Sequence, residues 1–501
     1  MVLKRAMTPD QRARSARKPS PRVRAALKSA TPRAPAQPPP LSIAILAAGQ
    51  GKRMRSDLPK VLQPLAGQPL LLHVLELAAE LAPAQLHVVY GHGGERVRAA
   101  CAELRVSSSL HWTRQEQQLG TGHALAQAIP AVPDSHRVLV LYGDVPLLRA
   151  ETLRRLIELA GADGIALLTA RLEDPTGYGR ILRDRRGRLR RIVEEADASE
   201  RERKVREVNT GVLVAPAGRL RALLARVAPR NAQREYYLTD VAGLASQAGI
   251  VVRTLETTDA TEVLGINDRL QLAVAEAEYR RRRARQLMQQ GVTIVDPTRI
   301  DLHGPIQVGR DVLLDVNVAL QGPVQLDDGV QIGRNCIVRH SAIGARTLLY
   351  ANCVVNEAQI GPDCRVGPFT HLRPGARLAE GVHLGNFVEI KNSTIAAGSK
   401  VNHLSYVGDS DVGAGVNVGA GTITCNYDGA NKWRTHIGDG AFIGSGSMLV
   451  APVSIGAEAT IGAGSTITSD APAGKLTLAR GRQVTLQEWE RPRQKDKAGG
   501  G

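Results

Sequence analysis

A glycine-rich turn follows the first apolar run of the chain. LAAGQGKRM (46–54) comes directly after the candidate strand SIAIL (42–46), and an open parallel sheet binds ligands where its strands end. The glycines of this turn let backbone N–H groups approach phosphate oxygens, with Arg53 and Lys60 as nearby positive charges. The turn is neither a Walker loop, since GxxxxGK[ST] is absent, nor a dinucleotide fingerprint, since Met54 replaces the third glycine.

Three further features support phosphate binding. LYGDVPLL (141–148) places Asp144 just after an apolar strand, where an unpaired carboxylate would be costly. A carboxylate beside bound phosphates most simply holds Mg²⁺. QLGTGHA (118–124) and DPTGYGR (174–180) are two more glycine-rich loops. Together the features predict a nucleotide site with a second phosphorylated substrate. The alternative interpretation is a set of ordinary turns, with Asp144 as a helix N-cap.

Short apolar runs alternate with helical patterns from Leu41 to about Leu264. Near-continuous apolar strands separated by amphipathic helices predict a parallel sheet covered on both faces. The candidate strands are 42–46, 86–90, 137–142, 165–170 and 211–215, and the candidate helices include 71–82 and 151–161. Residues 267–290 contain no Gly or Pro and are predicted to form a linking helix with a solvated basic side at Arg280–Arg283.

The apolar period changes to six after residue 291. A period of six fits neither a helix nor an alternating strand and indicates a β-helix of hexapeptide repeats, whose coils stack about 4.8 Å apart. The residues at six-residue steps are Ile360, Val366, Leu372, Leu378, Leu384, Ile390, and then Ile437, Ile443, Leu449, Ile455, Ile461 and Ile467. TITCNYDGANKWRT (422–435) interrupts the rhythm and predicts a loop on the binding face, or else a plain surface loop.

Composition and charge exclude several classes of protein. The chain is 43% apolar and 23% charged, as in soluble globular proteins, and lacks an apolar run of the ~18 residues that span a membrane. Residues 1–40 hold ten Lys/Arg and one acid, so +9 of the +17 net charge lies there and +8 remains for the other 461 residues. This stretch is predicted to be a disordered basic Pro-rich extension without a role in the chemistry; a nucleic-acid- or membrane-binding arm, or a transit peptide, is the alternative. Five cysteines without a CxxC pair favour reduced, buried thiols in the cytoplasm.

Specific motifs carry a family resemblance. LAAGQGKRMRSDLPKVL (46–62) resembles the L-x-x-G-x-G-x-R-M…P-K signature of sugar-nucleotide pyrophosphorylases. With the hexapeptide region, NHLSYVGD (402–409) and GAGTITCNYDG (419–429), the chain resembles the bacterial bifunctional N-acetylglucosamine-1-phosphate uridyltransferase/glucosamine-1-phosphate N-acetyltransferases from about Ser42 to Arg480. These enzymes acetylate glucosamine 1-phosphate and then uridylylate it to UDP-N-acetylglucosamine, a precursor for cell walls and lipopolysaccharide.

The resemblance also implies a domain plan. A Rossmann-like α/β nucleotidyltransferase domain is expected at 41–266, a linker helix at 267–290, a left-handed parallel β-helix acetyltransferase domain at 291–480, and a C-terminal tail at 481–501. The expected assembly is a cytoplasmic homotrimer that acts on small molecules, without nucleic-acid binding or membrane insertion.

For the first domain, the resemblance implies a site for UTP, N-acetylglucosamine 1-phosphate and Mg²⁺. Arg53 and Lys60 would neutralise phosphate charge, and Asp144 and Asn267 would hold the metal. Lys52 stands where these enzymes usually have Thr or Ser. The implied nucleotide- and sugar-binding residues are Leu46, Ala47, Ala48, Gly49, Lys60, Gln115, Gly120, Thr121, Tyr142, Gly143, Asp144, Gly179, Glu194, Asn209 and Asn267.

For the β-helix, the resemblance implies a site for glucosamine 1-phosphate and acetyl-CoA. His403 would be the general base that deprotonates the 2-ammonium group, a role that suits an imidazole at neutral pH. Arg373 and Lys391 would bind the sugar phosphate, and Tyr406 and Asn417 the sugar. The implied acetyl-CoA-binding residues are Ala420, Asn426, Tyr427, Ser445, Ala463 and Arg480.

Two other functions remain open from the sequence alone. One is a nucleotidyltransferase whose β-helix is only an oligomerisation and regulatory scaffold, although a bare scaffold does not need the set Arg373, Lys391, His403, Tyr406 and the Asn426-Tyr427 loop. The other is a nucleic-acid- or surface-binding protein that acts through residues 1–40, which would make its DNA binding sensitive to salt.

Overall fold

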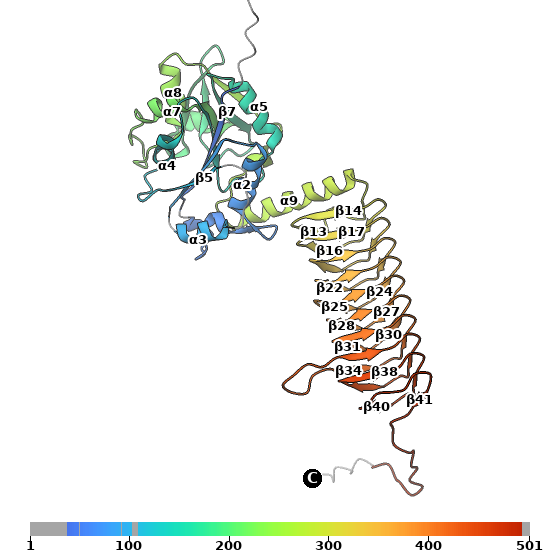
Figure 1. Ribbon diagram of the computed structural model, residues 1–501. Helices are drawn as coiled ribbons and strands as arrows, with labels where there is room; N and C mark the ends of the chain where they lie inside the picture. The colour runs from blue at the N-terminus through green and yellow to red at the C-terminus, as the bar shows by residue number, and fades with distance from the viewer. Residues whose placement is uncertain (1–37, 50, 92, 103–108, 493–501) are drawn as a thin grey trace, which may run out of the picture.

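The computed structural model describes residues 38–49, 51–91, 93–102 and 109–492. An α/β domain, a long helix and a β-helix follow one another along the chain (Figure 1). Most of the predicted basic extension, residues 1–37, lies outside the described residues, as do Gln50, the side chain of Lys52 and the end of the tail, 493–501. Within the described ranges, no helix has both the length and the apolar character needed to cross a membrane.

The first domain is built on a mixed sheet of strand order β11-β7-β10-β6-β1-β4-β5. Strand β10 runs antiparallel to β6 and β7, whereas the other neighbours on this path pair in parallel. The strands are β1 (Leu41–Ala47), β4 (Gln85–Tyr90), β5 (Ser109–Arg114), β6 (Arg137–Tyr142), β7 (Ile165–Arg171), β10 (Glu207–Pro216) and β11 (Val252–Glu256). The prediction of a parallel sheet is therefore wrong at 211–215.

The direction of β10 follows from its connection. Between β7 and β10 the chain forms the hairpin of β8 (Arg180–Arg183) and β9 (Leu189–Val193) and the four-residue helix α6 (Glu200–Arg203). A parallel return needs a crossover that lays a longer element over the sheet. Without one, the chain comes back beside β7 in the opposite direction.

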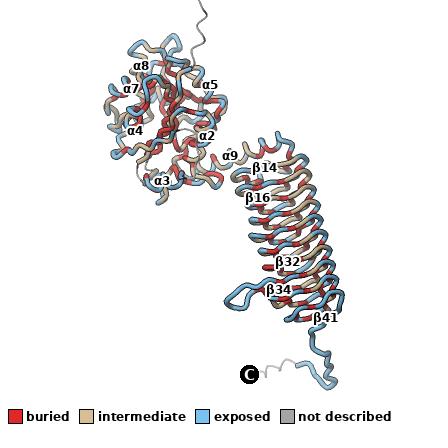
Figure 2. Tube along the Cα trace, in the orientation of Figure 1, coloured by how far each residue is buried: buried red, intermediate tan, exposed pale blue. Residues whose placement is uncertain are grey.

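Helices cover both faces of this sheet, as predicted. Ile43 and Ile45 of β1 pack in one apolar core with α2 (Leu70–Glu80) and α5 (Ala150–Ala160). On the opposite face, Ala44 and Leu46 share a core with α4 (Thr121–Ala128), α7 (Ala217–Leu224) and α8 (Asp240–Gln247). Figure 2 shows the resulting buried centre of the domain in red.

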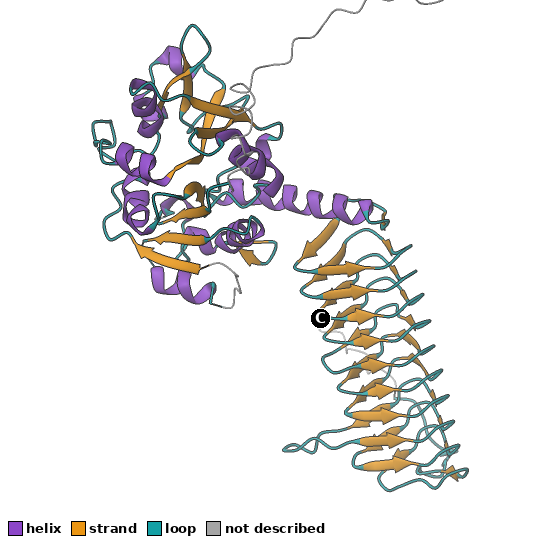
Figure 3. Cartoon of the chain, turned by 45° about the horizontal axis from the view of Figure 1, so that its top comes forward, coloured by secondary structure: helices purple, strands orange, loops and turns teal. Residues whose placement is uncertain are grey.

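The rest of the chain winds into a β-helix of three parallel sheets. Sheet I runs from β12 (Thr293–Ile294) to β41 (Leu476–Thr477), sheet II from β13 (Ile300–His303) to β40 (Thr466–Ile467), and sheet III from β14 (Ile306–Val308) to β38 (Val453–Ile455). Ile300 pairs with Val318 and Gln331 with Leu348, so one coil takes 18 or 17 residues. Figure 3 shows the stacked strands and one long hairpin that projects from them.

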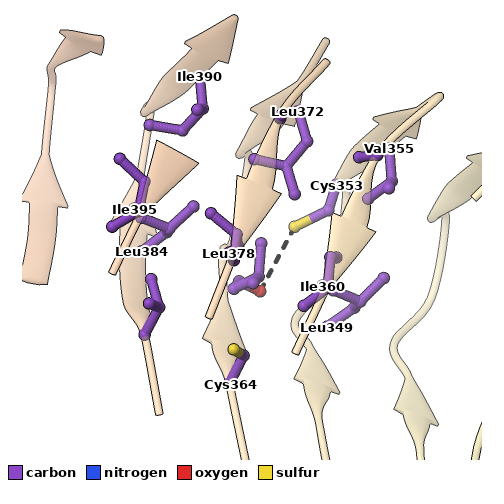
Figure 4. Packing of buried hydrophobic residues seen from close by; sticks show 14 of the residues in the cluster. Leu349, Cys353, Val355, Ile360, Cys364, Leu372, Leu378, Leu384, Ile390 and Ile395 are labelled. Atoms are coloured by element: carbon purple, nitrogen blue, oxygen red, sulfur yellow. Dashed lines mark hydrogen bonds between the residues drawn. The ribbon is translucent and has the colours of Figure 1, made fainter. Parts of the chain in front are cut away.

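The hexapeptide prediction is confirmed by the core of the β-helix. All the apolar residues at the predicted six-residue steps are buried, each at most 5% exposed. Figure 4 shows Leu372, Leu384 and Ile390 packed inside the coils beside Cys353 and Cys364. These two cysteines, with Cys101 and Cys336, are buried as predicted, whereas Cys425 is only half-buried. The interruption at 422–435 is the projecting hairpin, closed by a bridge between Tyr427 and Lys432.

Helix α9 (Arg269–Gln289) connects the two domains, close to the predicted limits. The side chain of Asp268 caps its first turn by accepting a hydrogen bond from the N–H of Gln271. The predicted solvated basic side is confirmed at the exposed Arg281 but wrong at Arg282 and Arg283, because both domains pack against the helix and supply acceptors. Arg282 donates to the carbonyl oxygen of Leu147 in the first domain, while Arg283 donates to that of Gly304 in the β-helix, at 3.2 Å.

One histidine at this junction makes stability depend on pH. Nε2 of His303 lies 3.6 Å from Oε1 of Glu276 on α9 and 3.2 Å from Oδ1 of Asp301 on β13. The nearby carboxylates of Glu276 and Asp301 raise the pKa of His303 above 6.5. Protonated His303 therefore contributes its full share to the free energy of unfolding at a pH below its unfolded pKa. That contribution is lost as the pH rises through the higher pKa of the folded state.

We expect His303→Gln to abolish this pH dependence. For an ion pair worth about 1 kcal/mol, the melting temperature of the wild type should exceed that of the variant by about 2–4 °C at pH 5.5 and by less at pH 8.5. Calorimetry at both pH values measures the difference. His371→Gln, on an exposed strand position, is the control; equal differences at both pH values would contradict the prediction.

Candidate active sites

A cavity of about 560 Å³ opens at the carboxyl ends of β1 and β6. Strand β1 lies between β4 and β6, so this is the point where the strand order reverses and where such sheets bind ligands. The residues implied for nucleotide binding gather here: Leu46, Ala47, Ala48, Gly49, Lys60, Gln115, Gly120, Thr121, Tyr142 and Asp144. Val61, Gln118, Ala124 and Glu235 complete the lining.

The loop before α4 forms one wall of the cavity. Gly120 has φ 109°, and a Cβ there would lie 2.7 Å from the carbonyl oxygen of Tyr236. Nε2 of Gln115 donates to the carbonyl oxygen of Gly120 at 3.2 Å, and Nε2 of Gln118 donates to that of Ala48 at 2.7 Å. The loop is thus tied both to segment 235–238 and to the turn after β1. Gln118 and Glu235 were not predicted as site residues, since only the fold brings them to the cavity.

We expect Gly120→Ala to weaken nucleotide binding. The variant combines a left-handed backbone with a steric clash, costing about 1–3 kcal/mol of strain, so the loop should shift and the KM for UTP should rise about 10-fold. Gly249→Ala is the matched control, because its φ of 74° is also left-handed but no atom lies within 4 Å of the added Cβ. Steady-state kinetics of both variants measure the effect, and equal KM values would contradict it.

Two side-chain oxygens converge on Lys60 beside the cavity. Nζ of Lys60 forms an ion pair with Oδ2 of Asp144 and donates to Oδ1 of Asn267 at 3.2 Å. The amide of Asn267 is oriented by its Nδ2, which donates to the carbonyl oxygen of Gly265. A carboxylate and an amide oxygen that converge on one cation fit Mg²⁺, a hard cation that also keeps water and phosphate ligands. Lys60 lies between the two implied metal ligands.

The implied sugar-binding residues form a group beyond Tyr142. The N–H of Asn209 donates to the carbonyl oxygen of Gly179 at 2.8 Å, and Oε1 of Glu194 accepts from the Thr239 hydroxyl at 2.8 Å. Burial raises the pKa of Glu194. Oδ1 of Asn209 is buried without a hydrogen-bond partner, which in a folded protein calls for a ligand or water.

Neither Gly143 nor Arg53 lines this cavity, and the implied sugar-binding group and Asn267 also lie outside its lining. Gly143 donates its N–H to the carbonyl oxygen of Leu46 at 2.9 Å, so it joins the two strand ends. Arg53 is exposed in the short 3₁₀ helix Lys52–Met54.

The second group of implied residues lies on sheet II and at the corner where sheet I leads into it. His403 ends β30 (Lys400–His403) and pairs in register with Asn386 of the preceding coil. Nδ1 of His403 lies 3.0 Å from Oδ1 of Asn386. In the tautomer that donates from Nδ1, Nε2 keeps its lone pair and can accept a proton. Asn386 was not predicted, because only the coil register reveals its place.

Positive charge gathers on and beside sheet II. Nη1 of Arg373 bonds Oε1 of Glu389 at 2.8 Å, and Glu389 pairs in register with Tyr406 of the next coil. The neighbouring Lys432, followed by Arg373, lowers the pKa of Lys391. Such a concentration of cations suits a phosphate group. Lys432 belongs to the projecting hairpin and was not predicted.

The implied acetyl-CoA residues fall into two sets. One set occupies the same position in successive coils: His403, Ala420, Ser445 and Ala463. The carbonyl oxygens of His403, Ala420 and Ser445 accept hydrogen bonds from the N–H groups of Gly421, Gly446 and Gly464, each of which directly follows the next member of the set. Nη1 of Arg480 donates to the carbonyl oxygen of Ala463 at 2.8 Å. Asn426 and Tyr427 belong instead to the hairpin that follows β34 (Ile423–Cys425) on sheet II.

Asn417 is separated from the other sugar-binding residues. It lies in β33 (Asn417–Val418) of sheet I, between Lys400 and Phe442 of the adjoining coils. The single chain therefore places it on a different sheet from Arg373, Lys391 and Tyr406.

Comparisons with known proteins agree with both domains. Residues 43–217 match the family model of the MobA-like NTP transferase domain, and residues 357–392 and 434–469 match that of the bacterial transferase hexapeptide (six repeats). The fold and the sites thus define a nucleotidyltransferase joined to a hexapeptide-repeat transferase. A solved nucleotidyl transferase from Methanothermobacter thermautotroptrophicus is 20% identical, with a TM-score of 0.35, and the match covers 48% of this chain and 97% of that one.

Curated relatives match nearly the full length. The chain is 56% identical over 452 residues to the bifunctional protein GlmU of Azoarcus sp. (strain BH72), covering 90% of this chain and 99% of the relative. It is 56% identical over 459 residues to GlmU of Aromatoleum aromaticum, covering 92% and 100%. The chain belongs to the GlmU family. It is a bifunctional enzyme, a uridyltransferase and an acetyltransferase of UDP-N-acetylglucosamine synthesis.

Proposed function

We propose that the cavity at β1 and β6 binds UTP, N-acetylglucosamine 1-phosphate and Mg²⁺, and that sheet II with the adjoining corner of sheet I binds glucosamine 1-phosphate and acetyl-CoA. The observation that carries the first assignment is that the side-chain oxygens of Asp144 and Asn267 both contact the ammonium group of Lys60, beside the glycine turn. The second assignment is supported by His403, whose hydrogen bond to Asn386 leaves one ring nitrogen free. His403 ends β30 of sheet I, at the corner that leads into sheet II, and sheet II carries Lys391, with Arg373 directly after its strand β25 (His371–Leu372).

Uridylyl transfer in the cavity needs positioning more than proton transfer. A phosphate oxygen of the sugar 1-phosphate attacks the α-phosphorus of UTP, a new P–O bond forms, and the bond to the β-phosphate breaks to release pyrophosphate. The nucleophile is ionised near neutral pH, so no protein base is required. Mg²⁺ held by Asp144 and Asn267 supplies charge neutralisation. Lys60 adds positive charge to the phosphates, and Gln115 and Thr121 hold the base.

Sugar selection falls to the group beyond Tyr142. Glu194 and the unpartnered Oδ1 of Asn209 offer acceptors for hydroxyl and amide hydrogens of the N-acetylglucosamine moiety. A buried acceptor left unpaired by the wrong sugar would cost about 1–3 kcal/mol, which gives discrimination.

Acetyl transfer in the β-helix begins with a proton transfer. Nε2 of His403 takes a proton from the 2-ammonium group of glucosamine 1-phosphate, and the freed amine attacks the thioester carbonyl of acetyl-CoA. The C–N bond forms, the C–S bond breaks, and CoA leaves as a thiolate that takes up a proton. Arg373, Lys391 and Lys432 hold the sugar phosphate.

The proposal includes a cytoplasmic homotrimer whose acetyl sites are shared between subunits. Asn417 pairs with Lys400 at the start of β30, whereas His403 ends that strand, so a second copy would bring Asn417 to the sugar. Phe369, Phe387 and Leu404 form an exposed apolar column next to sheet II, 50%, 54% and 63% exposed. Each has a left-handed backbone, a costly conformation for a bulky residue. Burial of this column against another copy would offset that cost.

Two separate assays test the proposal. One follows CoA release from acetyl-CoA with glucosamine 1-phosphate, and the other follows pyrophosphate release from UTP with N-acetylglucosamine 1-phosphate and Mg²⁺. We expect both products, the second only with the metal, and a sedimentation mass near three times 53.6 kDa. Acetyl transfer by a monomer would contradict the shared site, and activity without divalent metal would contradict the Mg²⁺ assignment.

A further inference from the structure

A buried carboxylate lies at the base of the projecting hairpin. Asp409 is 6% exposed at the turn after β31 (Tyr406–Gly408), where the chain leaves sheet II. Its Oδ1 accepts a hydrogen bond from Nδ2 of Asn392 at 2.5 Å, and its Oδ2 accepts one from Nδ2 of Asn426. Asn392 belongs to the preceding coil and Asn426 to the following one. The carboxylate therefore ties three successive coils together at one corner.

The same residue also fixes both ends of the hairpin. Asn426 opens it, and the N–H of Thr435, where β35 (Thr435–Ile437) begins, donates to the carbonyl oxygen of Asp409 at 3.2 Å. Within the hairpin, the N–H of Trp433 donates to the carbonyl oxygen of Asn426 at 2.8 Å. Tyr427 and Lys432 therefore lie on a hairpin whose two ends are both hydrogen-bonded to Asp409.

We infer that Asp409 is a positioning residue for acetyl transfer, because it fixes the hairpin whose Asn426, Tyr427 and Lys432 meet acetyl-CoA and the sugar phosphate. This inference rests on the proposed function of the hairpin. Both asparagines donate to Asp409, so only a side chain with two acceptor oxygens satisfies them. An asparagine at 409 has one acceptor oxygen, and its amide group would face one of the donors.

Charge supports the same role. Burial alone would raise the pKa of Asp409, but hydrogen bonds from Asn392 and Asn426 and the nearby Lys391 and Lys432 outweigh it and lower the pKa. The carboxylate is therefore ionised at neutral pH and accepts from both neighbours. Charge-assisted hydrogen bonds of this kind are about twice as strong as neutral ones.

The test is Asp409→Asn in the full-length enzyme. Asparagine tolerates the left-handed φ of 49° at this position, so the change removes an acceptor without straining the backbone. We expect the KM for acetyl-CoA to rise about 10-fold, with uridylyl transfer unchanged, and hydrogen exchange at the amides of Trp433 and Thr435 to accelerate. Asp363→Asn is the matched control, because Asp363 is also left-handed but pairs with Arg346 at the exposed surface.

Each outcome decides the inference. Wild-type KM and wild-type exchange in Asp409→Asn would overturn it. If that variant fails to fold, Asn426→Ala breaks the same contact from the hairpin side, and unchanged exchange at Thr435 would then overturn the inference. A wild type without acetyl transfer would overturn the proposed function instead, while faster exchange in Asp409→Asn would still identify Asp409 as the anchor of the hairpin.

Discussion

Replacing His403 by alanine should slow acetyl transfer by about 10²–10⁴-fold, the usual contribution of a general base, and leave uridylyl transfer unchanged. The 2-ammonium group has no lone pair, so it cannot attack the thioester until a base removes a proton. Asn386, 3.0 Å from Nδ1, orients the ring but cannot accept that proton in its place. The loss should appear in kcat, because the phosphate-binding residues Arg373 and Lys391 remain.

Parallel assays of CoA release and pyrophosphate release measure this effect. His383→Ala is the control, since His383 begins β27 (His383–Asn386) and pairs with Lys400, whereas His403 stands at the other end of β30 on the same sheet. Loss of both activities in His403→Ala would indicate a folding defect. Retention of acetyl transfer would show that another group is the base.

Replacing Asp144 by asparagine should reduce uridylyl transfer by about 10²–10⁴-fold and increase the Mg²⁺ concentration needed. Two side-chain oxygens contact Lys60, one from Asp144 and one from Asn267. The first belongs to a charged carboxylate and the second to a neutral amide. An amide in place of the carboxylate leaves two neutral oxygens, which bind a hard divalent cation weakly. Acetyl transfer should be unchanged, because it takes place in the other domain.

The measurement is pyrophosphate release as a function of Mg²⁺ concentration. Asp134→Asn is the matched control, because Asp134 lies in the same domain but pairs with Arg221 at the surface, where its side chain is 70% exposed. A variant with wild-type activity and wild-type metal dependence would exclude Asp144 as a ligand.

The fold was largely predictable because burial leaves a periodic trace in the sequence. Ile443 and Ile461, for example, stand at six-residue steps because each points into the core of a coil, and both are fully buried. The direction of a strand leaves no such trace. Residues 211–215 are apolar whether β10 runs parallel or antiparallel, so the reversal followed only from the short connection before it.

The candidate sites were predictable where a motif is local. Gly49 and Asp144 follow strands directly, and the residues around each show where the strand ends. Asn386 and Lys432 were missed because coil register or a folded hairpin brings them beside His403 and Lys391. Arg282 was misread for the same reason: its acceptor, the carbonyl oxygen of Leu147, lies far away along the chain.

The coils between helix α9 and His403 set the distance between the two proposed sites. Residues 306–368 contribute no side chain to either proposed site, yet they determine how far apart the two sites stand along the β-helix (Figure 1). Because strands pair coil to coil, a whole coil, such as the 17 residues from Gln331 to the position before Leu348, is a removable unit of about 4.8 Å. The separation of the two chemistries can therefore change in discrete steps, without altering the residues that perform either one.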